Sequence, residues 1–330
     1  MTLHQTLAKS TTARLRTRRQ PRNGWRRPLL ALLLVTLAHP GMAQKALPLR
    51  EQQMPNSRET NNPSGNNKPL AQPGSPEKNT AQTDTTELPG DPLLFNVSEP
   101  LLIYYPAHPA TRNGASVIVC PGGGFYYEHI KTEGTDVAKW LNAKGIAVFI
   151  LQYHTVHCET TLPVKERGEK RQDTTSVIRL LSAVVPQAIA DAKQSIAYVR
   201  KHAAEWDLSP NRIGIMGFSA GGTLAVACAF DFTNENKPDF IAPIYPYVPP
   251  TLKMNIGNQT PPVFIAAASD DEYHLVPASI DLYSRWLKAG RPAELHIYSK
   301  GGHGFGMNRK DQPSDSWINR FEEWFRTEGL

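Results

Sequence analysis

Ser219 stands in a sequence pattern that favours a nucleophilic serine. It lies in a Gly-Phe-Ser-Ala-Gly stretch at 217–221, between an apolar, β-branched run at 212–216 and a run of small residues at 222–230. This order predicts a strand, a sharp turn and a helix, the setting that exposes a serine hydroxyl for attack on a carbonyl carbon. The neighbouring glycines let the strand and the helix pass closely while the serine adopts strained backbone angles.

His303 is the candidate base for this serine. A serine hydroxyl reacts when a histidine takes its proton, and a carboxylate orients the histidine. An expected strand at 263–268 runs into two aspartates, and an expected strand at 294–298 runs into a glycine-rich turn that holds His303. Neighbouring residues on an extended segment point to opposite sides, so one of the two aspartates should reach the imidazole. We favour Asp271 as the acid and keep Asp270 as the alternative.

Gly123, Gly124 and Ala220 are the candidates for an oxyanion hole, the set of N–H donors that stabilises a tetrahedral oxyanion. Ala220 follows the serine directly. The two glycines belong to a Pro-Gly-Gly-Gly-Phe stretch that follows an expected strand at 116–120. A glycine run could also cradle a phosphate, but no Gly-Lys-Ser/Thr ending follows this one, which disfavours a P-loop.

Strand and helix patterns alternate along residues 91–330, and this alternation predicts the α/β class, with a mostly parallel sheet covered by helices on both faces. The expected strands are 116–120, 146–151, 212–216, 240–245, 263–268 and 294–298. The expected helices are 135–144, 186–204, 222–230, 278–289 and 314–327. Residues 155–185 have the character of an insertion between a strand and the following helix.

The N-terminal part predicts an exported protein. Residues 1–43 hold a basic stretch, a short apolar run and Gly-Met-Ala before Gln44, the order of a signal peptide. The apolar run is shorter than the ~20 residues that span a bilayer, so we expect no membrane association after cleavage and a secreted or periplasmic protein. Residues 44–90 are rich in Asn, Gln, Pro, Thr and Ser, and this composition predicts a disordered linker before the catalytic domain at 91–330.

The distribution of charge excludes a nucleic-acid-binding protein. The chain has a formal net charge of +6, but residues 1–43 carry eight positive charges and no acidic residue, so removing them leaves −2. A nucleic-acid-binding domain would keep a basic balance. No nucleic-acid partner is therefore expected.

Cysteine and histidine usage gives no metal or cofactor site. The chain has three cysteines, too few for a framework of paired disulfides. Cys120 and Cys228 fall in an expected strand and helix, where buried apolar roles are expected. Cys158 follows His154 and His157, but a fourth ligand at a suitable spacing is missing, so a polar loop is expected there.

The chain resembles the α/β-hydrolase superfamily from about residue 116 to 330. It is similar to the bacterial secreted esterases related to acetylxylan esterases, feruloyl esterases and dienelactone hydrolase. The stretches that carry the resemblance are 119–125, 203–214 leading into the serine turn, and 292–298 leading into Gly-Gly-His-Gly-Phe-Gly. The resemblance implies a triad of Ser219, Asp271 and His303, with Gly123, Gly124 and Ala220 at the oxyanion hole. The chain departs from relatives in a longer loop at 272–274 and in the 155–185 insertion, which we expect to cover the site.

These observations predict a metal-independent serine esterase with no cofactor. Its expected substrate is a small-molecule or carbohydrate ester, with acetyl esters of plant cell-wall polysaccharide as the leading candidate. A serine peptidase-like hydrolase is one alternative, and a non-catalytic carbohydrate-binding protein is another. The fold alone does not fix the acyl group or the carbohydrate.

Overall fold

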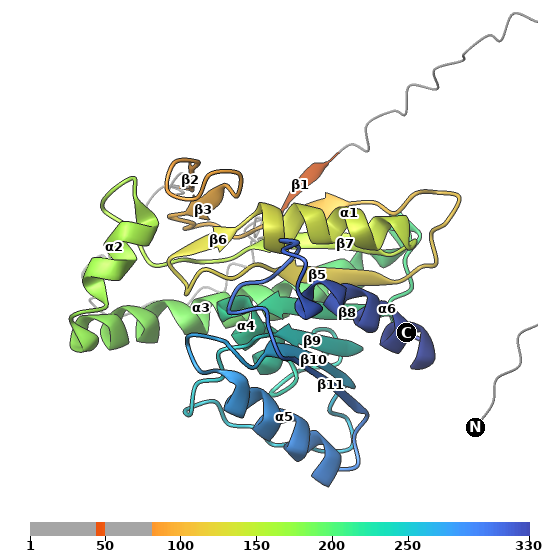
Figure 1. The fold of residues 1–330 in the computed structure, drawn as a ribbon. Coiled ribbons are helices and arrows are strands. Elements are labelled where there is room, and N and C mark those ends of the chain that lie inside the picture. Colours follow the sequence, from red (N-terminus) through yellow and green to blue (C-terminus); the bar gives the residue numbers. More distant parts are fainter. Residues whose placement is uncertain (1–43, 50–80) are drawn as a thin grey trace, which may run out of the picture. The chain divides into compact units, whose positions relative to one another are not determined.

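A twisted sheet of eight strands runs through the part of the chain that the structure describes, residues 44–49 and 81–330 of a computed structural model (Figure 1). The strands lie in the order β1, β4, β7, β5, β8, β9, β10, β11. Their bounds are β1 Lys45–Pro48, β4 Leu101–Tyr105, β7 Ala147–Gln152, β5 Ser116–Cys120, β8 Ile213–Phe218, β9 Phe240–Ile244, β10 Val263–Ala268 and β11 Ala293–Tyr298. Strand β4 is antiparallel to both of its neighbours, and the strands from β7 to β11 are parallel. The predicted mostly parallel sheet is confirmed.

Helices cover both faces of this sheet, as the alternating pattern predicted. One face carries α1 Asp136–Ala143 and α6 Trp317–Thr327, and the other carries α3 Thr174–Lys201, α4 Ala220–Cys228 and α5 Val276–Lys288. Alternate residues of a strand point to opposite faces. Along β5, Val117 and Val119 therefore pack under α1 and α6, whereas Ile118 and Cys120 pack under α3 and α4.

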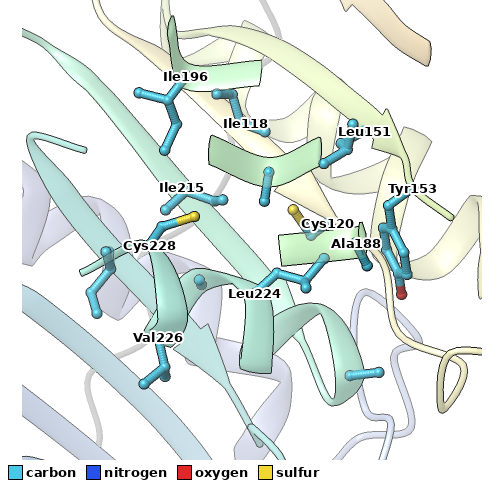
Figure 2. Packing of buried hydrophobic residues seen from close by; sticks show 14 of the residues in the cluster. Ile118, Cys120, Leu151, Tyr153, Ala188, Ile196, Ile215, Leu224, Val226 and Cys228 are labelled. Carbon is cyan, nitrogen blue, oxygen red and sulfur yellow. The ribbon is translucent and has the colours of Figure 1, made fainter. Parts of the chain in front are cut away.

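The side of the sheet that holds α4 has a core of packed apolar side chains (Figure 2). Leu224 of α4 lies there with Ile118 and Ile215 of the sheet and Ile196 of α3, all of them fully buried. Cys120 and Cys228 lie in the same cluster, which confirms their predicted apolar role. Burial raises the pKa of the Cys228 thiol to about 12, so this sulfur stays protonated and inert near neutral pH.

A second sheet has three antiparallel strands, of which two precede β5 in the chain and one follows it. It consists of β2 Gln82–Asp84, β3 Leu93–Phe95 and β6 Tyr127–His129. Strand β6 directly follows the glycine-rich loop at 121–125. The small sheet therefore holds the far end of that loop.

The predicted linker at 44–90 differs from the structure at both of its ends. Residues 45–48 form β1, which pairs with β4, and residues 82–84 form β2. Leu47 and Leu49 are buried in the core, and the carbonyl of Leu49 accepts a hydrogen bond from Gln194 of α3. Strands of three or four residues are too short to show a period in the sequence, so composition alone predicted a linker. The signal peptide predicted at 1–43 and the middle of the linker lie outside the described residues.

Helix α3 begins twelve residues earlier than predicted, at Thr174 instead of 186. The side chain of Asp173 accepts a hydrogen bond from the N–H of Ser176 and caps the helix there. Pro186, the first residue of the predicted helix, lies inside the observed helix. The buried stripe of the helix continues on the N-terminal side of this proline through Val184 and the half-buried Leu181. Packing of this stripe outweighs the loss of one backbone hydrogen bond.

The earlier part of the insertion at 155–185 contains α2, Pro163–Lys170. Short helical turns complete the chain at Lys131–Thr135, Ala203–Trp206 and Pro313–Ser316. Among the described helices, none is both long and apolar enough to cross a membrane. The described residues also include no group of three or more His, Cys, Asp or Glu side chains that could hold a metal ion.

The burial of Leu49 makes the place of the N-terminal strand testable. Leu49→Ala should lower the free energy of unfolding by about 2–5 kcal/mol, because it removes a buried side chain from the core. Urea or thermal denaturation measures this change. Lys45→Ala, an exposed change in the adjoining strand, is the control and should alter stability by less than about 0.5 kcal/mol. Equal, negligible effects of both substitutions would mean that this segment is a linker, as its composition suggested.

Candidate active site

Ser219 stands at the turn between β8 and α4. Its backbone has φ 51° and ψ −110°, a strained conformation for a residue with a side chain. The flanking glycines are required by close backbone contacts. A Cβ atom on Gly217 would lie 2.0 Å from the carbonyl oxygen of Gly221, and one on Gly221 would lie 2.0 Å from the carbonyl oxygen of Cys120. The sequence pattern around the serine therefore forms the predicted strand, turn and helix.

A chain of hydrogen bonds links Ser219, His303 and Asp271. The Oγ atom of Ser219 lies 2.8 Å from Nε2 of His303, and Nδ1 of His303 lies 2.9 Å from Oδ2 of Asp271. In the neutral tautomer that suits both contacts, the serine hydroxyl donates to Nε2 and the Nδ1–H group donates to the carboxylate. The Asp271 side chain is only 1% exposed, and its Oδ1 atom accepts a further hydrogen bond from the N–H of Tyr273. The arrangement can move a proton from the serine to the imidazole.

The two neighbours of Asp271 contact the backbone of the histidine loop. Oδ1 of Asp270 accepts a hydrogen bond of 2.8 Å from the N–H of Gly302, and Oε2 of Glu272 accepts one of 2.8 Å from the N–H of His303. The Gly302 hydrogen bond lowers the pKa of Asp270. Three successive carboxylates therefore bind one loop, and the middle one meets the imidazole. The sequence predicted that only one aspartate would reach His303, but it gave no sign of the role of Glu272.

The glycine-rich loop lies beside the serine. Gly123 has φ 140°, and a Cβ atom there would lie 1.8 Å from the carbonyl oxygen of Tyr127, so only glycine fits. Gly123 and Gly124 line a cavity of about 490 Å³ that also contains Ser219 and His303. Ala220, the first residue of α4, lines a second cavity of about 310 Å³, together with Gly124 and the same serine and histidine. The predicted oxyanion residues are thus gathered around Ser219, and their role stays a prediction.

Glu133 connects these loops, although no sequence pattern indicated it. This glutamate is 2% exposed. Its Oε2 atom accepts a hydrogen bond of 2.6 Å from the N–H of Gly122, and its Oε1 atom accepts one of 2.7 Å from the hydroxyl of Tyr245. The same hydroxyl accepts a hydrogen bond of 3.0 Å from the N–H of Gly306, beyond the histidine. Burial and the adjacent Glu133 carboxylate raise the pKa of Tyr245 well above its usual range.

Helix α2 brings two arginines to the site. The guanidinium group of Arg167 lies against Gly124, where a Cβ atom would approach it to 2.7 Å, and its Nη1 donates to the hydroxyl of Tyr127. Arg171, just after the helix, lies over the ring of Tyr273. That ring in turn packs edge-on against the His303 imidazole, with 4.7 Å between ring centroids. The insertion therefore reaches the site, as expected.

The residues around Cys158 lie apart from this site and form structural contacts. The ring of His154 is hydrogen-bonded to the carboxylate of Asp191, and the N–H of Cys158 donates to the side chain of Asn96. Burial raises the pKa of the Cys158 thiol to about 12. These contacts agree with the loop that was expected here.

Comparison with known proteins identifies the family. Residues 103–328 match the sequence profile of the dienelactone hydrolase family, which is more than half of the chain. The chain belongs to the dienelactone hydrolase family. Membership confirms the predicted α/β-hydrolase fold and the class of hydrolases to which the motifs pointed.

Relatives of this dienelactone hydrolase family member include an acetylxylan esterase of Xylanibacter ruminicola, 29% identical over 251 residues, which are 66% of this chain and 47% of that protein. Endo-1,4-beta-xylanase B of Butyrivibrio fibrisolvens is 25% identical over 227 residues, 57% of this chain and 32% of that protein. The chain thus spans about half or less of the length of these curated relatives. The crystal structure of an acetyl ester-xyloside bifunctional hydrolase from Caldicellulosiruptor lactoaceticus superposes with a TM-score of 0.58 at 24% identity, covering 86% of this chain and 96% of that one. This likeness shows a shared fold.

The unequal contacts of the two aspartates lead to a test. Asp271→Asn should lower kcat by several orders of magnitude, because an amide neither fixes the histidine tautomer nor offsets the charge of an imidazolium ion. Asp270→Asn should lower kcat by about 10-fold or less, because its carboxylate contacts the loop backbone and the Lys300 ammonium group and not the imidazole, and an amide oxygen still accepts the backbone hydrogen bond. Steady-state kinetics on an activated ester measures both variants. The acid assignment moves to Asp270 if that variant proves the more damaging one.

Proposed function

We propose that the protein is a serine esterase in which Ser219 is the nucleophile, His303 the general base and Asp271 the carboxylate that orients the base. The observation that carries this proposal is the chain of hydrogen bonds from Ser219 through His303 to Asp271. Ser219 and His303 also line two cavities. The same chain of contacts favours catalysis over the alternative of a carbohydrate-binding protein without activity.

In the proposed reaction, Oγ of Ser219 attacks the ester carbonyl carbon while its proton passes to Nε2 of His303. Asp271 accepts the Nδ1–H hydrogen bond and offsets the positive charge of the imidazolium. The N–H groups of Ala220 and of the Gly123–Gly124 stretch stabilise the oxyanion. The alcohol leaves with the proton from His303, and a water molecule, activated by the same imidazole, then releases the acid from the acyl-enzyme.

The proposed substrate is an ester of a carbohydrate, with acetyl esters of plant cell-wall polysaccharide as the first candidate. Two observations support this class. The names of the relatives refer to acetylxylan and xylan, and polar side chains such as Asp91, His129 and Asn308 line the larger cavity. Hydroxyl groups of a sugar would find hydrogen-bond partners there.

We also propose that residues 1–43 act as a signal peptide and that the enzyme works in the periplasm or outside the cell. The basic stretch and short apolar run of these residues support this location. The catalytic domain would then include residues 44–49 and 81–90, which contribute strands β1 and β2, in addition to the predicted 91–330.

Replacement of the nucleophile tests the mechanism. Ser219→Ala should lower kcat by about 10⁴-fold or more, because no other hydroxyl stands within reach of His303 Nε2 in the described contacts. Hydrolysis of p-nitrophenyl acetate measures the loss, and circular dichroism checks the fold. Ser182→Ala, an exposed serine on α3, is the matched control and should keep wild-type activity. More than about 1% residual activity in Ser219→Ala would exclude Ser219 as the nucleophile.

Treatment with a chelator tests whether the reaction needs a metal ion. Overnight treatment with EDTA should leave kcat and KM for the same ester unchanged, because the proposed proton transfers use only Ser219, His303 and Asp271. Loss of activity that added zinc or calcium restores would overturn this mechanism.

A further inference from the structure

Two cavities of different chemical character meet at Ser219. Both are lined by Ser219 and His303, together with Gly124, Arg167 and Tyr273. The reacting carbonyl group therefore has a separate space on each side, and an ester has two parts to place in them.

The larger cavity, about 490 Å³, has apolar side chains such as Leu88 and Val164 in its wall, but it holds more polar groups than the smaller one. The polar side chains that line it away from the serine include Asp91, His129, Thr132, Glu272 and Asn308. A hydrocarbon chain in this space would cover polar groups without giving them hydrogen bonds, which is costly. The hydroxyl-rich alcohol of a carbohydrate ester fits it better.

The smaller cavity, about 310 Å³, is mainly apolar beyond the serine, and the side chains of Arg167 and Arg171 also line it. Its walls are Phe125, Val177, Leu181, Tyr247 and Leu275, with Tyr126 beside them. Ala220, the proposed oxyanion donor next to Ser219, lines this cavity and not the larger one. A sugar placed here would lose hydrogen bonds to water and gain few from the walls, whereas an acyl chain would bury apolar surface.

We propose, on the basis of the serine esterase mechanism above, that the smaller cavity is the acyl-binding subsite and that it favours acyl chains longer than acetyl. Under this proposal, carbohydrate esters with longer acyl chains take the place of the acetyl esters named above as the first candidate. Cavities that hold small molecules have volumes of about 300–1,000 Å³, and this one lies at the lower end of that range. The single methyl group of an acetyl ester would leave most of it without contacts. Each methylene added to the acyl chain would bury further apolar surface against the walls.

Val177 and Leu181 set the depth of this subsite. They lie four residues apart in the N-terminal part of α3 and therefore share one face of the helix. Both belong to the insertion at 155–185. Larger side chains at these positions would shorten the cavity without touching Ser219, His303 or the glycine-rich loop.

The experiment is an acyl-chain series on one alcohol, with p-nitrophenyl acetate, butyrate, hexanoate and octanoate as substrates of the full-length enzyme. kcat/KM should rise by up to about four-fold for each added methylene until the cavity is filled.

Leu181→Trp should lower the ratio of kcat/KM for hexanoate to kcat/KM for acetate by at least ten-fold. If that variant does not fold, Val177→Phe takes its place and should lower the same ratio. Ile178→Trp is the matched control, since Ile178 is 60% exposed on the same helix turn and does not line the cavity. It should leave the ratio unchanged.

The outcomes separate the subsite from the mechanism. A wild-type enzyme that prefers acetate, with a ratio that neither variant changes, would overturn the proposal while leaving the serine esterase intact. A second series, butyrates of methanol, butanol and benzyl alcohol, tests the opposite placement. If Leu181→Trp changes selectivity in that series and not in the acyl series, the smaller cavity holds the alcohol and the proposal is wrong. Inactivity of the wild-type protein on every ester, with no labelling of Ser219 by a fluorophosphonate, would instead contradict the proposed esterase itself.

Discussion

The buried carboxylate of Glu133 fixes the relative positions of the loops that form the site. A charge away from water is tolerated only when its oxygens are hydrogen-bonded, and both oxygens of Glu133 are. One accepts from the Gly122 N–H of the glycine-rich loop and the other from the Tyr245 hydroxyl, which itself accepts from the Gly306 N–H of the histidine loop. Tyr245 also packs edge-on against His303, with 5.0 Å between ring centroids. A shift of the glycine-rich loop would leave Oε2 of Glu133 without its donor, and a shift of the histidine loop would remove the Gly306 donor from the Tyr245 hydroxyl. The network therefore favours one arrangement of the site.

The register of the parallel sheet brings the same loops together before any side chain is considered. Cys120 at the end of β5 pairs with Gly217 of β8, so the glycine-rich loop and the serine turn leave the sheet side by side. Ala268 of β10 pairs with Tyr298 of β11, so the aspartates and the histidine loop also leave it together. The carboxyl ends of parallel strands meet at one edge, which is where ligands bind in open α/β sheets. The three carboxylates from Asp270 to Glu272 then bind the histidine loop across that edge.

The parts of this arrangement that could be predicted from sequence are those with strong local signals. Strands buried on both faces give continuous apolar runs, and the bounds of β5 and β10 were predicted without error. The serine turn and the glycine run could be recognised because their backbone geometry requires glycine.

Other features have no local signal. Strand β1 has four residues and one buried leucine, so its pairing with β4 leaves no local pattern. Pro186 suggested a helix start because a proline is usual there, but packing on its N-terminal side decides where α3 begins. Glu133 and Tyr245 meet only in space, 112 residues apart, so no local signal indicated them.

Walls of the smaller cavity come from the insertion, whereas the proposed reacting groups do not. Ser219, Asp271 and His303 follow strands of the central sheet, whereas Arg167, Val177 and Leu181 come from α2 and the start of α3. Helix α3 is anchored to the sheet only in its later part, through buried residues such as Ala192 and Ile196. Its earlier turns have exposed residues around a narrow apolar stripe, so their side chains can change at little cost to the core. Such a division lets one arrangement of the proposed reacting groups serve different esters, because the α3 residues that line the apolar cavity, Val177 and Leu181, are only partly buried.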